Sequence, residues 1–374
     1  MANRYWVGGS ANWDGTAGTK WSLTDGGAGG QAVPTSSDDV FFTATSGAVT
    51  VTLADGNVAT CKSLTCTGFT GTITETGSGA GSANIYGSLV LSSTMSFLPS
   101  GTITFKAATS GHTITTAGKT LLCRIVFHDD SNNNTGAWTL QDDLSCTHIN
   151  GISNENGILN TNGKTLTIQS FSAFLSNGQT VNLGASVVNI YGSGAEPWAF
   201  SSSNTLTTSG SSINITSTRD NSFTVLLGGA TYGNMSIIAN DVTIRDSGGF
   251  SQLILGAGML ATFQSSRTYT ISDNFIVQSS EYDRTILDST SGSAFTLTKS
   301  SGTITVTGCE IYNSTATGGA VWVALSSIDG GGNSGWVFSS AEKPQVFSGL
   351  SASTNVKPQV SSAQAGSSTK PSAR

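Results

Sequence analysis

The chain has 374 residues, of which only 10% are charged and 37% are apolar, with a formal net charge of −6. Globular proteins usually carry about 25% charged residues, so this composition argues against a helical protein with charged wet faces. The net negative charge, without any run of Lys or Arg, argues against a nucleic-acid partner. No apolar run is long enough to cross a membrane, and the N-terminus lacks the pattern of a signal peptide, so we expect synthesis and assembly in a cytoplasm.

The N-terminal segment, residues 1–45, holds three of the seven tryptophans: Trp6, Trp13 and Trp21. Glycines and small polar residues separate them at no helical period. In a stacked β structure, bulky rings at an end can close the apolar core and blunt the exposed strand edges. We therefore predict that residues 1–45 form an aromatic-rich cap and attachment segment.

Residues 46–340 consist of short runs in which apolar residues alternate with Thr and Ser, which is the period of half-buried strands. Such runs are AVTVTL (48–53), GTITFK (101–106), KTLTIQS (164–170), TVNLGASVVNIYG (180–192), INITST (213–218), DVTIRDS (241–247) and GTITVTG (302–308). No stretch of ten residues keeps a helical period. The sequence predicts an all-β chain.

The same short phrases also return along this region, such as GKTL at 118–121 and 163–166. LLC and LSC align Leu121 with Leu144 and Cys123 with Cys146, a shift of 23 residues. A unit of this size fits one solenoid turn of two or three strands. We predict a right-handed parallel β-helix over residues 46–340, with rows of Ile, Val, Leu and Cys inside. A sandwich or barrel with Asn-Gly hairpins is the alternative.

At the other end, Trp322 and Trp336 bring five of the seven tryptophans close to the chain termini and predict a second aromatic cap. Beyond Phe347 the sequence has too few apolar residues for another turn. Residues 341–374 are predicted to form an extended low-complexity tail or docking arm.

Both ends carry sequence motifs in addition to tryptophans. The first combines W-V-G-G, N-W, W-S and V-P-T-x-x-D-D-V-x-F, and the second contains D-G-G-x-N-x-G-W-x-F. They are matched at Trp6–Gly9, Asn12–Trp13, Trp21–Ser22, Val33–Phe41 and Asp329–Phe338. In these motifs the chain resembles β-helical bacteriophage virion proteins, which are described as minor tail, tail-fibre or particle-surface proteins. The resemblance implies a structural role in the virion, with other tail or capsid proteins as partners, and it brings no catalytic residue or cofactor.

Paired carboxylates are the first candidates for chemistry, because a glycoside hydrolase needs two carboxyl groups about 5 to 9.5 Å apart. The candidate pairs are Asp38/Asp39, Asp129/Asp130, Asp142/Asp143 and Glu281/Asp283. Adjacent residues of a strand point to opposite faces, and Asp favours turns, so we interpret each pair as part of a turn. Carboxylates from neighbouring turns could still meet, which keeps a tailspike-type polysaccharide depolymerase as the alternative function.

Metal sites are the second candidates. His128, in FHDDSNNN (127–134), has two acidic neighbours, and the segment is either an acid–base or metal site or a polar turn that protrudes. DGGGNSG (329–335) offers oxygen ligands for Ca²⁺, with a glycine-rich capping turn as the preferred interpretation. His112 and His148 have no acidic neighbours. GSGAGSAN (77–84) lacks the Lys of a phosphate-binding loop.

The cysteines Cys61, Cys66, Cys123, Cys146 and Cys309 are odd in number and show no CxxC spacing. We expect them to be buried as small apolar residues rather than joined in disulfides. A metal site at Cys61 and Cys66 is the weaker alternative.

Together these observations predict a non-enzymatic structural protein of a virion, displayed on the particle surface as a tail fibre, a minor tail protein or a head decoration. Host surface glycans are a candidate contact, with Tyr86, Tyr191 or Trp198 as candidate stacking residues; an interior or turn-packing position of these aromatic rings is the alternative. A depolymerase and a bacterial surface adhesin are the alternatives. No catalytic, cofactor-binding or metal-binding residue is predicted. A homo-oligomer is a further candidate partner, but the chain has no coiled-coil heptads that would fix the number of subunits.

Overall fold

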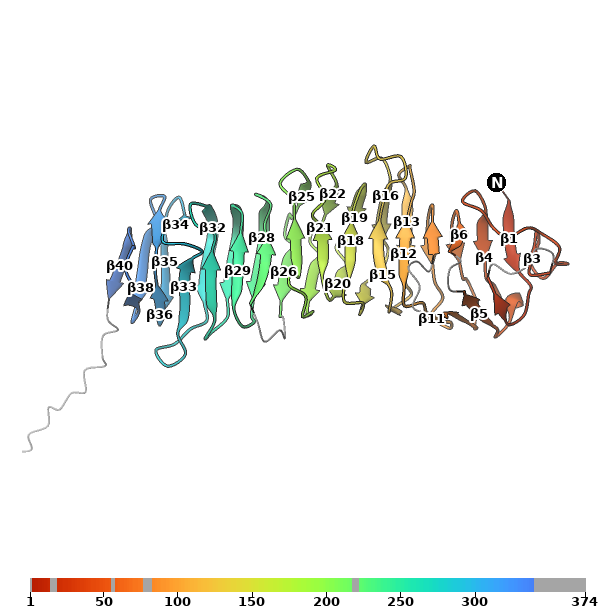
Figure 1. Ribbon diagram of the computed structural model, residues 1–374, viewed down its shortest axis with the longest axis horizontal. Helices are drawn as coiled ribbons and strands as arrows, with labels where there is room; N and C mark the ends of the chain where they lie inside the picture. Colours follow the sequence, from red (N-terminus) through yellow and green to blue (C-terminus); the bar gives the residue numbers. More distant parts are fainter. Residues whose placement is uncertain (1, 14–18, 55–57, 77–82, 217–221, 340–374) are drawn as a thin grey trace, which may run out of the picture. The chain divides into compact units, whose positions relative to one another are not determined.

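A computed structural model of the chain describes residues 2–13, 19–54, 58–76, 83–216 and 222–339. The strands of successive turns pair in parallel and stack into one solenoid (Figure 1). This confirms the predicted parallel β-helix. It excludes the sandwich or barrel for these residues, whose single antiparallel strand pair joins residues 5–6 to residues 21–22. The described residues contain no α-helix and one short 3-10 helix, η1 (Ala44–Ser46). No helix in this part of the chain is long and apolar enough to cross a bilayer.

The strands form five sheets, A to E. Sheet A contains β1 (Asn3–Trp6), β3 (Trp21–Ser22), β4 (Asp39–Phe41), β7 (Leu64–Thr65), β10 (Leu89–Val90), β13 (His112–Thr115), β16 (Ala137–Leu140), β19 (Ile158–Asn160), β22 (Thr180–Asn182) and β25 (Thr205–Thr207). Sheet B contains β2 (Ala11–Asn12), β5 (Thr50–Leu53), β8 (Thr72–Glu75) and β11 (Ser96–Leu98). Sheet C contains β6 (Ala59–Cys61), β9 (Ala83–Ile85), β12 (Thr102–Phe105), β15 (Arg124–Phe127), β18 (Ile152–Asn154), β21 (Phe171–Ala173), β24 (Trp198–Phe200), β27 (Phe223–Leu226), β29 (Val242–Arg245), β31 (Leu260–Phe263), β33 (Thr285–Ser289), β36 (Cys309–Ile311) and β39 (Ile328–Asp329).

Sheet D contains β14 (Thr120–Leu121), β17 (Leu144–Cys146), β20 (Thr165–Ile168), β23 (Val187–Ile190), β26 (Ser212–Ile215), β28 (Thr231–Ile237), β30 (Gly248–Leu255), β32 (Thr268–Val277), β34 (Phe295–Thr298) and β37 (Ser314–Thr317). Sheet E contains β35 (Thr303–Thr307), β38 (Val321–Leu325) and β40 (Trp336–Ser339).

Sheet C has 13 strands and continues through the solenoid from β6 to β39. From β4 to β27, each turn has one strand in sheet A, one in sheet B or D, and one in sheet C. In the next three turns, single long strands of 7, 8 and 10 residues (β28, β30 and β32) replace the two short ones. β32 pairs with β34 and also packs against β35, where the turns again have three strands. The long strands therefore join two faces of the solenoid into one.

The alternation of apolar and polar residues decides which side chains fill the core. On sheet C, Ile103, Ile125 and Ile152 lie in register on successive strands and are at most 1% exposed. Thr104, next to Ile103, lies on the outer face and is only half-buried. Burial of each such apolar side chain stabilises the fold by about 1.5–3 kcal/mol. The predicted interior rows are therefore present.

Both ends of the described solenoid carry aromatic clusters, as predicted. At the N-terminal end, Trp6, Trp13 and Trp21 are buried, and the ring centroid of Trp21 lies 4.9 Å from that of Trp6 and 5.0 Å from that of Trp13. At the other end, Trp322 is buried and lies 5.3 Å from the half-buried Trp336. The predicted tail, residues 341–374, lies outside the described residues.

The register of the repeated phrases differs from the one that we predicted. Leu121 pairs with Cys146 rather than with Leu144, and Leu144 pairs with Leu166. Nine residues connect β15 to β16 in the turn from Leu121 to Cys146, whereas three connect β18 to β19 in the turn from Leu144 to Leu166, so these two turns contain 25 and 22 residues. Turns of unequal length shift the register, so a constant spacing in sequence misaligns the strands by two residues.

Candidate functional site

The first carboxylate pair, Asp38 and Asp39, is divided between two structural roles. The buried Asp38 carboxylate accepts hydrogen bonds from the N–H groups of Ala2 and Thr35 and from the Thr35 hydroxyl. Asp39 pairs with Lys62 of the next turn, with 3.2 Å between carboxylate oxygen and ammonium nitrogen. These contacts support the interpretation of this pair as part of a turn.

In the second pair, Asp129 and Asp130, the carboxylate of Asp129 is bound to its own loop and not to His128. The side chain of Asp129 is fully buried and accepts hydrogen bonds from the N–H groups of Ser131, Thr135 and Gly136. Burial alone raises the pKa of Asp129, but these bonds and one from the Ser131 hydroxyl outweigh it, so the pKa lies below its usual value. Asp129 therefore stabilises the protruding loop through these hydrogen bonds and does not act as an acid–base partner of His128.

The last two pairs also lie in turns. Asp142 accepts hydrogen bonds from the N–H and the hydroxyl of Thr116, and Asp143 accepts one from the N–H of Thr165. Both residues thus join neighbouring turns. Glu281 and Asp283 belong to an exposed turn in which the backbones of Ser280 and Asp283 bond to each other. In each pair the contacts favour a structural role.

The described residues offer no metal centre. No group of three or more His, Cys, Asp or Glu side chains in these ranges lies in a metal-binding arrangement. Cys61 and Cys66 are buried, and burial raises the pKa of both thiols. In the DGGGNSG turn, Asp329 accepts hydrogen bonds from Asn333 and Gly331, and Asn333 accepts one from Ser314. Their oxygens hold the capping turn, which leaves calcium without a prepared ligand set.

The remaining histidines and the glycine-rich segment add no site. Burial, with Lys62 nearby, lowers the pKa of His112, and burial, with Arg124 nearby, lowers that of His148. Both rings are half-buried against the turns. Residues 77–82 of the glycine-rich segment lie outside the described residues.

Of the three aromatic residues predicted to stack on glycans, Trp198 is excluded. Its ring is fully buried, stacks on Phe171 at 4.9 Å, and donates a hydrogen bond from Nε1 to the hydroxyl of Tyr232. Tyr86 and Tyr191 are half-buried on the outside of the solenoid. The position of Trp198 within a strand, which a single sequence does not reveal, decides that it faces inward.

A stripe of charged residues was not predicted. It consists of the residue that directly follows the sheet C strand in each of five successive turns. These residues are Lys62, Tyr86, Lys106, His128 and Glu155, of which Tyr86 is uncharged. The ammonium of Lys106 lies 3.0 Å from Asp130 of the next turn and 5.6 Å from the centroid of the Tyr86 ring. A search for polar residues at intervals of one turn would have found this stripe.

The charged residues of the stripe pair with oppositely charged residues of the same chain. Arg124 and His128 both approach Glu155, at 3.1 Å and 3.6 Å. In the pairs Lys62–Asp39 and Lys106–Asp130, the two lysines of the stripe also have acidic partners in neighbouring turns. Partly exposed pairs of this kind contribute about 0–1 kcal/mol each. The stripe joins turns and leaves little net charge to attract an ionic ligand.

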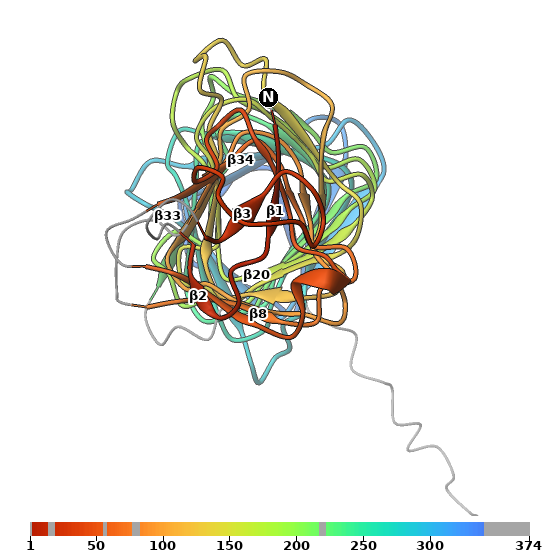
Figure 2. The same cartoon turned by 90° about the vertical axis from the view of Figure 1, so that its right-hand side faces the viewer.

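A second unpredicted feature is the loop ridge, which comprises residues 129–136, 174–178 and 201–204. Figures 1 and 2 show it as the yellow and green loops at the top of the solenoid. The side chain of Asn134 donates to the carbonyl of Asn177, and Asn204 donates to the carbonyl of Leu175. Phe174 and Leu175 are 53% and 48% exposed on this hydrogen-bonded support. Adjacent exposed apolar side chains on loops that are joined by hydrogen bonds offer a surface for contact with another molecule.

A third feature is an open groove on the starts of β28, β30 and β32, with a volume of about 400 Å³. We call it the hydroxyl groove, because five Ser and Thr residues line it. Its lining includes Thr231, Ser247, Gly249, Thr268, Thr270 and Ser272. Small-molecule sites have volumes of roughly 300–1,000 Å³, so the groove has the size of a binding site.

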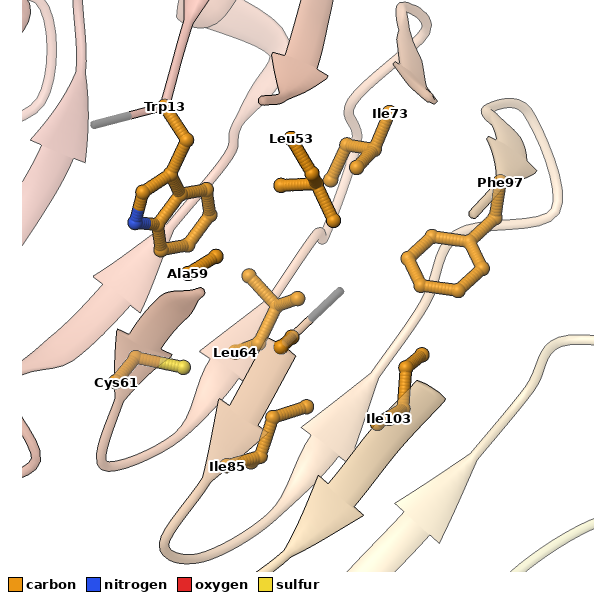
Figure 3. Close-up of a pocket in the computed structure, with 10 residues that line it drawn as sticks. Trp13, Leu53, Ala59, Cys61, Leu64, Ile73, Ile85, Phe97 and Ile103 are labelled. Atoms are coloured by element: carbon orange, nitrogen blue, oxygen red, sulfur yellow. The ribbon is translucent and has the colours of Figure 1, made fainter. Parts of the chain in front are cut away.

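The gap that the described core residues leave near the N-terminal end is much smaller. Figure 3 shows a gap near the N-terminal end, into which Trp13, Leu53, Ile73 and Phe97 point. Its volume is about 10 Å³, which is smaller than or comparable to the space needed for one water molecule. This gap belongs to the packing of the core.

Comparisons with protein-family profiles, with curated proteins and with solved structures find no match to this chain.

Proposed function

We propose that this protein is a structural component of a bacteriophage virion and that it is displayed on the particle surface. The observation that carries the proposal is the uninterrupted sheet C, whose 13 strands are held over a filled apolar core. A parallel ladder of this length resists local opening and proteolysis, because each strand is held on both sides by its neighbours. The motifs at Trp6–Gly9 and Asp329–Phe338 support the virion setting through their resemblance to phage particle proteins.

A non-enzymatic role is part of this proposal. Asp38, Asp129 and Asp142 accept several hydrogen bonds each in turns, and Asp39 and Asp130 are paired with lysines. A general acid needs a raised pKa, whereas the pKa values of Asp38 and Asp129 lie below their usual value. These contacts support a structural protein over the depolymerase.

The loop ridge is the surface that we assign to contact with the host. Its exposed Phe174 and Leu175 are surrounded in sequence by Ser and Asn, which supply adaptable hydrogen bonds beside an apolar anchor. Such a surface can pack against the apolar face of a surface glycan while amide groups bond its hydroxyls. A double variant, Phe174→Ser with Leu175→Ser, should reduce adsorption of phage to host cells and leave the fold intact.

Immunogold labelling of purified phage particles with an antibody against this chain tests the proposal. We expect gold on projecting fibres or the tail, or regular labelling over the head if the protein is a decoration. Mass spectrometry of the same particles is the control for masked epitopes. Intact particles that lack the protein by both measurements would overturn the virion assignment.

A further inference from the structure

The hydroxyl groove exists because of the long strands β28, β30 and β32. The first of them, β28, packs against β25, the last strand of sheet A. The later residues of the three strands pair with β26 or with each other in sheet D. A register shift between Phe250 and Gln252 interrupts the pairing of β30 with β32. The groove lies on the first residues and reaches Ser272 at this bulge.

Gly249 forms the floor of the groove. It pairs with Thr231 on one side and Thr270 on the other, in an outward-facing position of the sheet. A Cβ atom at Gly249 would lie 3.1 Å from the hydroxyl oxygen of Thr231. Gly weakens a strand interior and often marks a place where another molecule approaches the backbone closely. Its presence between two threonines makes a recess where a side chain would otherwise stand.

The walls of the groove carry hydroxyl groups that are available for binding. The side-chain hydroxyls of Thr231, Thr268 and Thr270 make no hydrogen bond to any residue that the structure describes, whereas Ser272 donates to the carbonyl of Phe250. A hydroxyl can donate one hydrogen bond and accept two. The three free groups can therefore bond to a ligand whose own groups both donate and accept.

The charge of the groove narrows the ligand class. None of its lining residues is ionisable. The ammonium of Lys299 lies beside it and donates to the carbonyls of Ser272 and Asp273, at 2.8 Å and 2.7 Å. The groove itself therefore offers a ligand hydroxyl groups rather than charges, so a ligand rich in hydroxyls fits it best.

We propose that the hydroxyl groove binds one uncharged sugar ring of a surface glycan. Sugar hydroxyls both donate and accept, as the groove hydroxyls do, and the recess at Gly249 admits a ring close to the backbone. The identification of the sugar as part of a host glycan rests on the proposed function, whereas the presence of the binding site does not.

Saturation-transfer difference NMR of the full chain, with a panel of neutral and acidic mono- and disaccharides, tests this proposal. Gly249→Val fills the recess with a side chain that strands accept, and it should abolish the signal. Thr268→Val with Thr270→Val removes two hydroxyls at constant shape and should weaken binding about threefold to tenfold per hydroxyl. Thr296→Val is the matched control, because Thr296 pairs with Thr268 on the same face but does not line the groove.

Transfer to at least one neutral sugar, lost in Gly249→Val and kept in Thr296→Val, would support the site. No transfer to any neutral sugar, preference for acidic sugars, or equal loss in all variants would overturn it. Circular dichroism checks that each variant is folded. If particles carry the protein but no sugar binds, the groove proposal fails alone; if sugar binds but particles lack the protein, the virion proposal fails alone.

Discussion

At the N-terminal end of the solenoid the edge strand β3 has two residues and runs antiparallel to β1, whereas at the C-terminal end β40 has four residues and runs parallel to β38. Trp21 of β3 is 1% exposed and lies under other rings. Val337 of β40 is 53% exposed, and no described residue covers that edge. A short antiparallel strand offers a poor template for a further strand, whereas a parallel edge of ordinary geometry can be extended. Within the described residues, the N-terminal end is thus a closed end, whereas β40 leaves the last edge of sheet E in the form of an interior strand.

The largest expected difference between the ends comes from their tryptophans. Trp21→Ala should lower the free energy of unfolding by about 3–5 kcal/mol, because it empties a fully buried aromatic site. Trp336→Ala should cost only about 2 kcal/mol, because Trp336 is half-buried. Urea denaturation followed by far-ultraviolet circular dichroism measures both. Equal losses would mean that the two ends contribute equally to stability.

A turn near the C-terminal end should be the next most sensitive place. Asn333→Ala removes the side chain that bonds the carbonyl of Ile311 and the N–H of Ser314, so we expect the free energy of unfolding to fall by about 2 kcal/mol in the same urea titration.

The melting temperature should not respond to calcium, because the side-chain oxygens of this turn already accept hydrogen bonds from the chain. Differential scanning calorimetry with added Ca²⁺ and with a chelator checks this: a calcium-dependent rise in melting temperature would restore the ion-binding interpretation.

The pH response should distinguish the ends by a smaller effect. Burial raises the pKa of Asp38, but hydrogen bonds from Thr35 and Ala2 and the charge of Arg4 outweigh it, so the pKa lies below its usual value. A carboxyl group with a depressed folded pKa stabilises the fold above its unfolded pKa, about 3.9, and this contribution is lost as pH falls through the folded value. Hydrogen exchange in residues 2–6, corrected for intrinsic rates, should therefore accelerate below about pH 4.

Two comparisons control this experiment. Asp38→Asn should weaken the N-terminal segment by about 1 kcal/mol and remove its pH dependence. Exchange in β40, which has no ionisable side chain, should change less over the same range. Acceleration of equal size at both ends would show that acid loosens the solenoid as a whole and that Asp38 has no special part in it.

The smallest effect on stability is expected at the exposed edge. Val337→Lys should change the free energy of unfolding by no more than about 0.5 kcal/mol, since the side chain lies outside the core. It should nevertheless reduce concentration-dependent self-association, because a charge on an edge strand opposes pairing with another copy. Sedimentation velocity measures this. Leu23→Lys, at an exposed position near the closed end, is the control that should leave association unchanged.

The sequence predicts the fold class well because a solenoid repeats its signal in every turn. Alternating runs such as GTITFK contain both the strand and its inward face, and Ile103 and Phe105 are buried as that pattern requires. The register is harder to predict, because it depends on the number of residues in each corner. The nine-residue connection after β15 lengthens its turn, so Leu121 pairs with Cys146 instead of the expected Leu144.

The candidate site was less predictable for the same reason. Trp198 is a candidate stacking residue by its sequence but lies inside, because an aromatic residue suits both faces of a strand and a single chain does not decide between them. The hydroxyl groove joins Thr231, Gly249 and Thr270 from three turns. Ser, Thr and Gly are abundant along the whole chain, so only the paired register distinguishes these residues from the many others.

The parallel pairing of successive turns also sets the length of the solenoid by the number of its turns. Val188 of β23 and Ile213 of β26 occupy equivalent positions in adjacent turns. Deletion of the segment between them would remove one whole turn and join strands that already share a geometry, at a cost in length of about 4.8 Å. Duplication would add the same increment. The length of the solenoid can therefore change in increments of one turn, while the structures at its two ends stay the same.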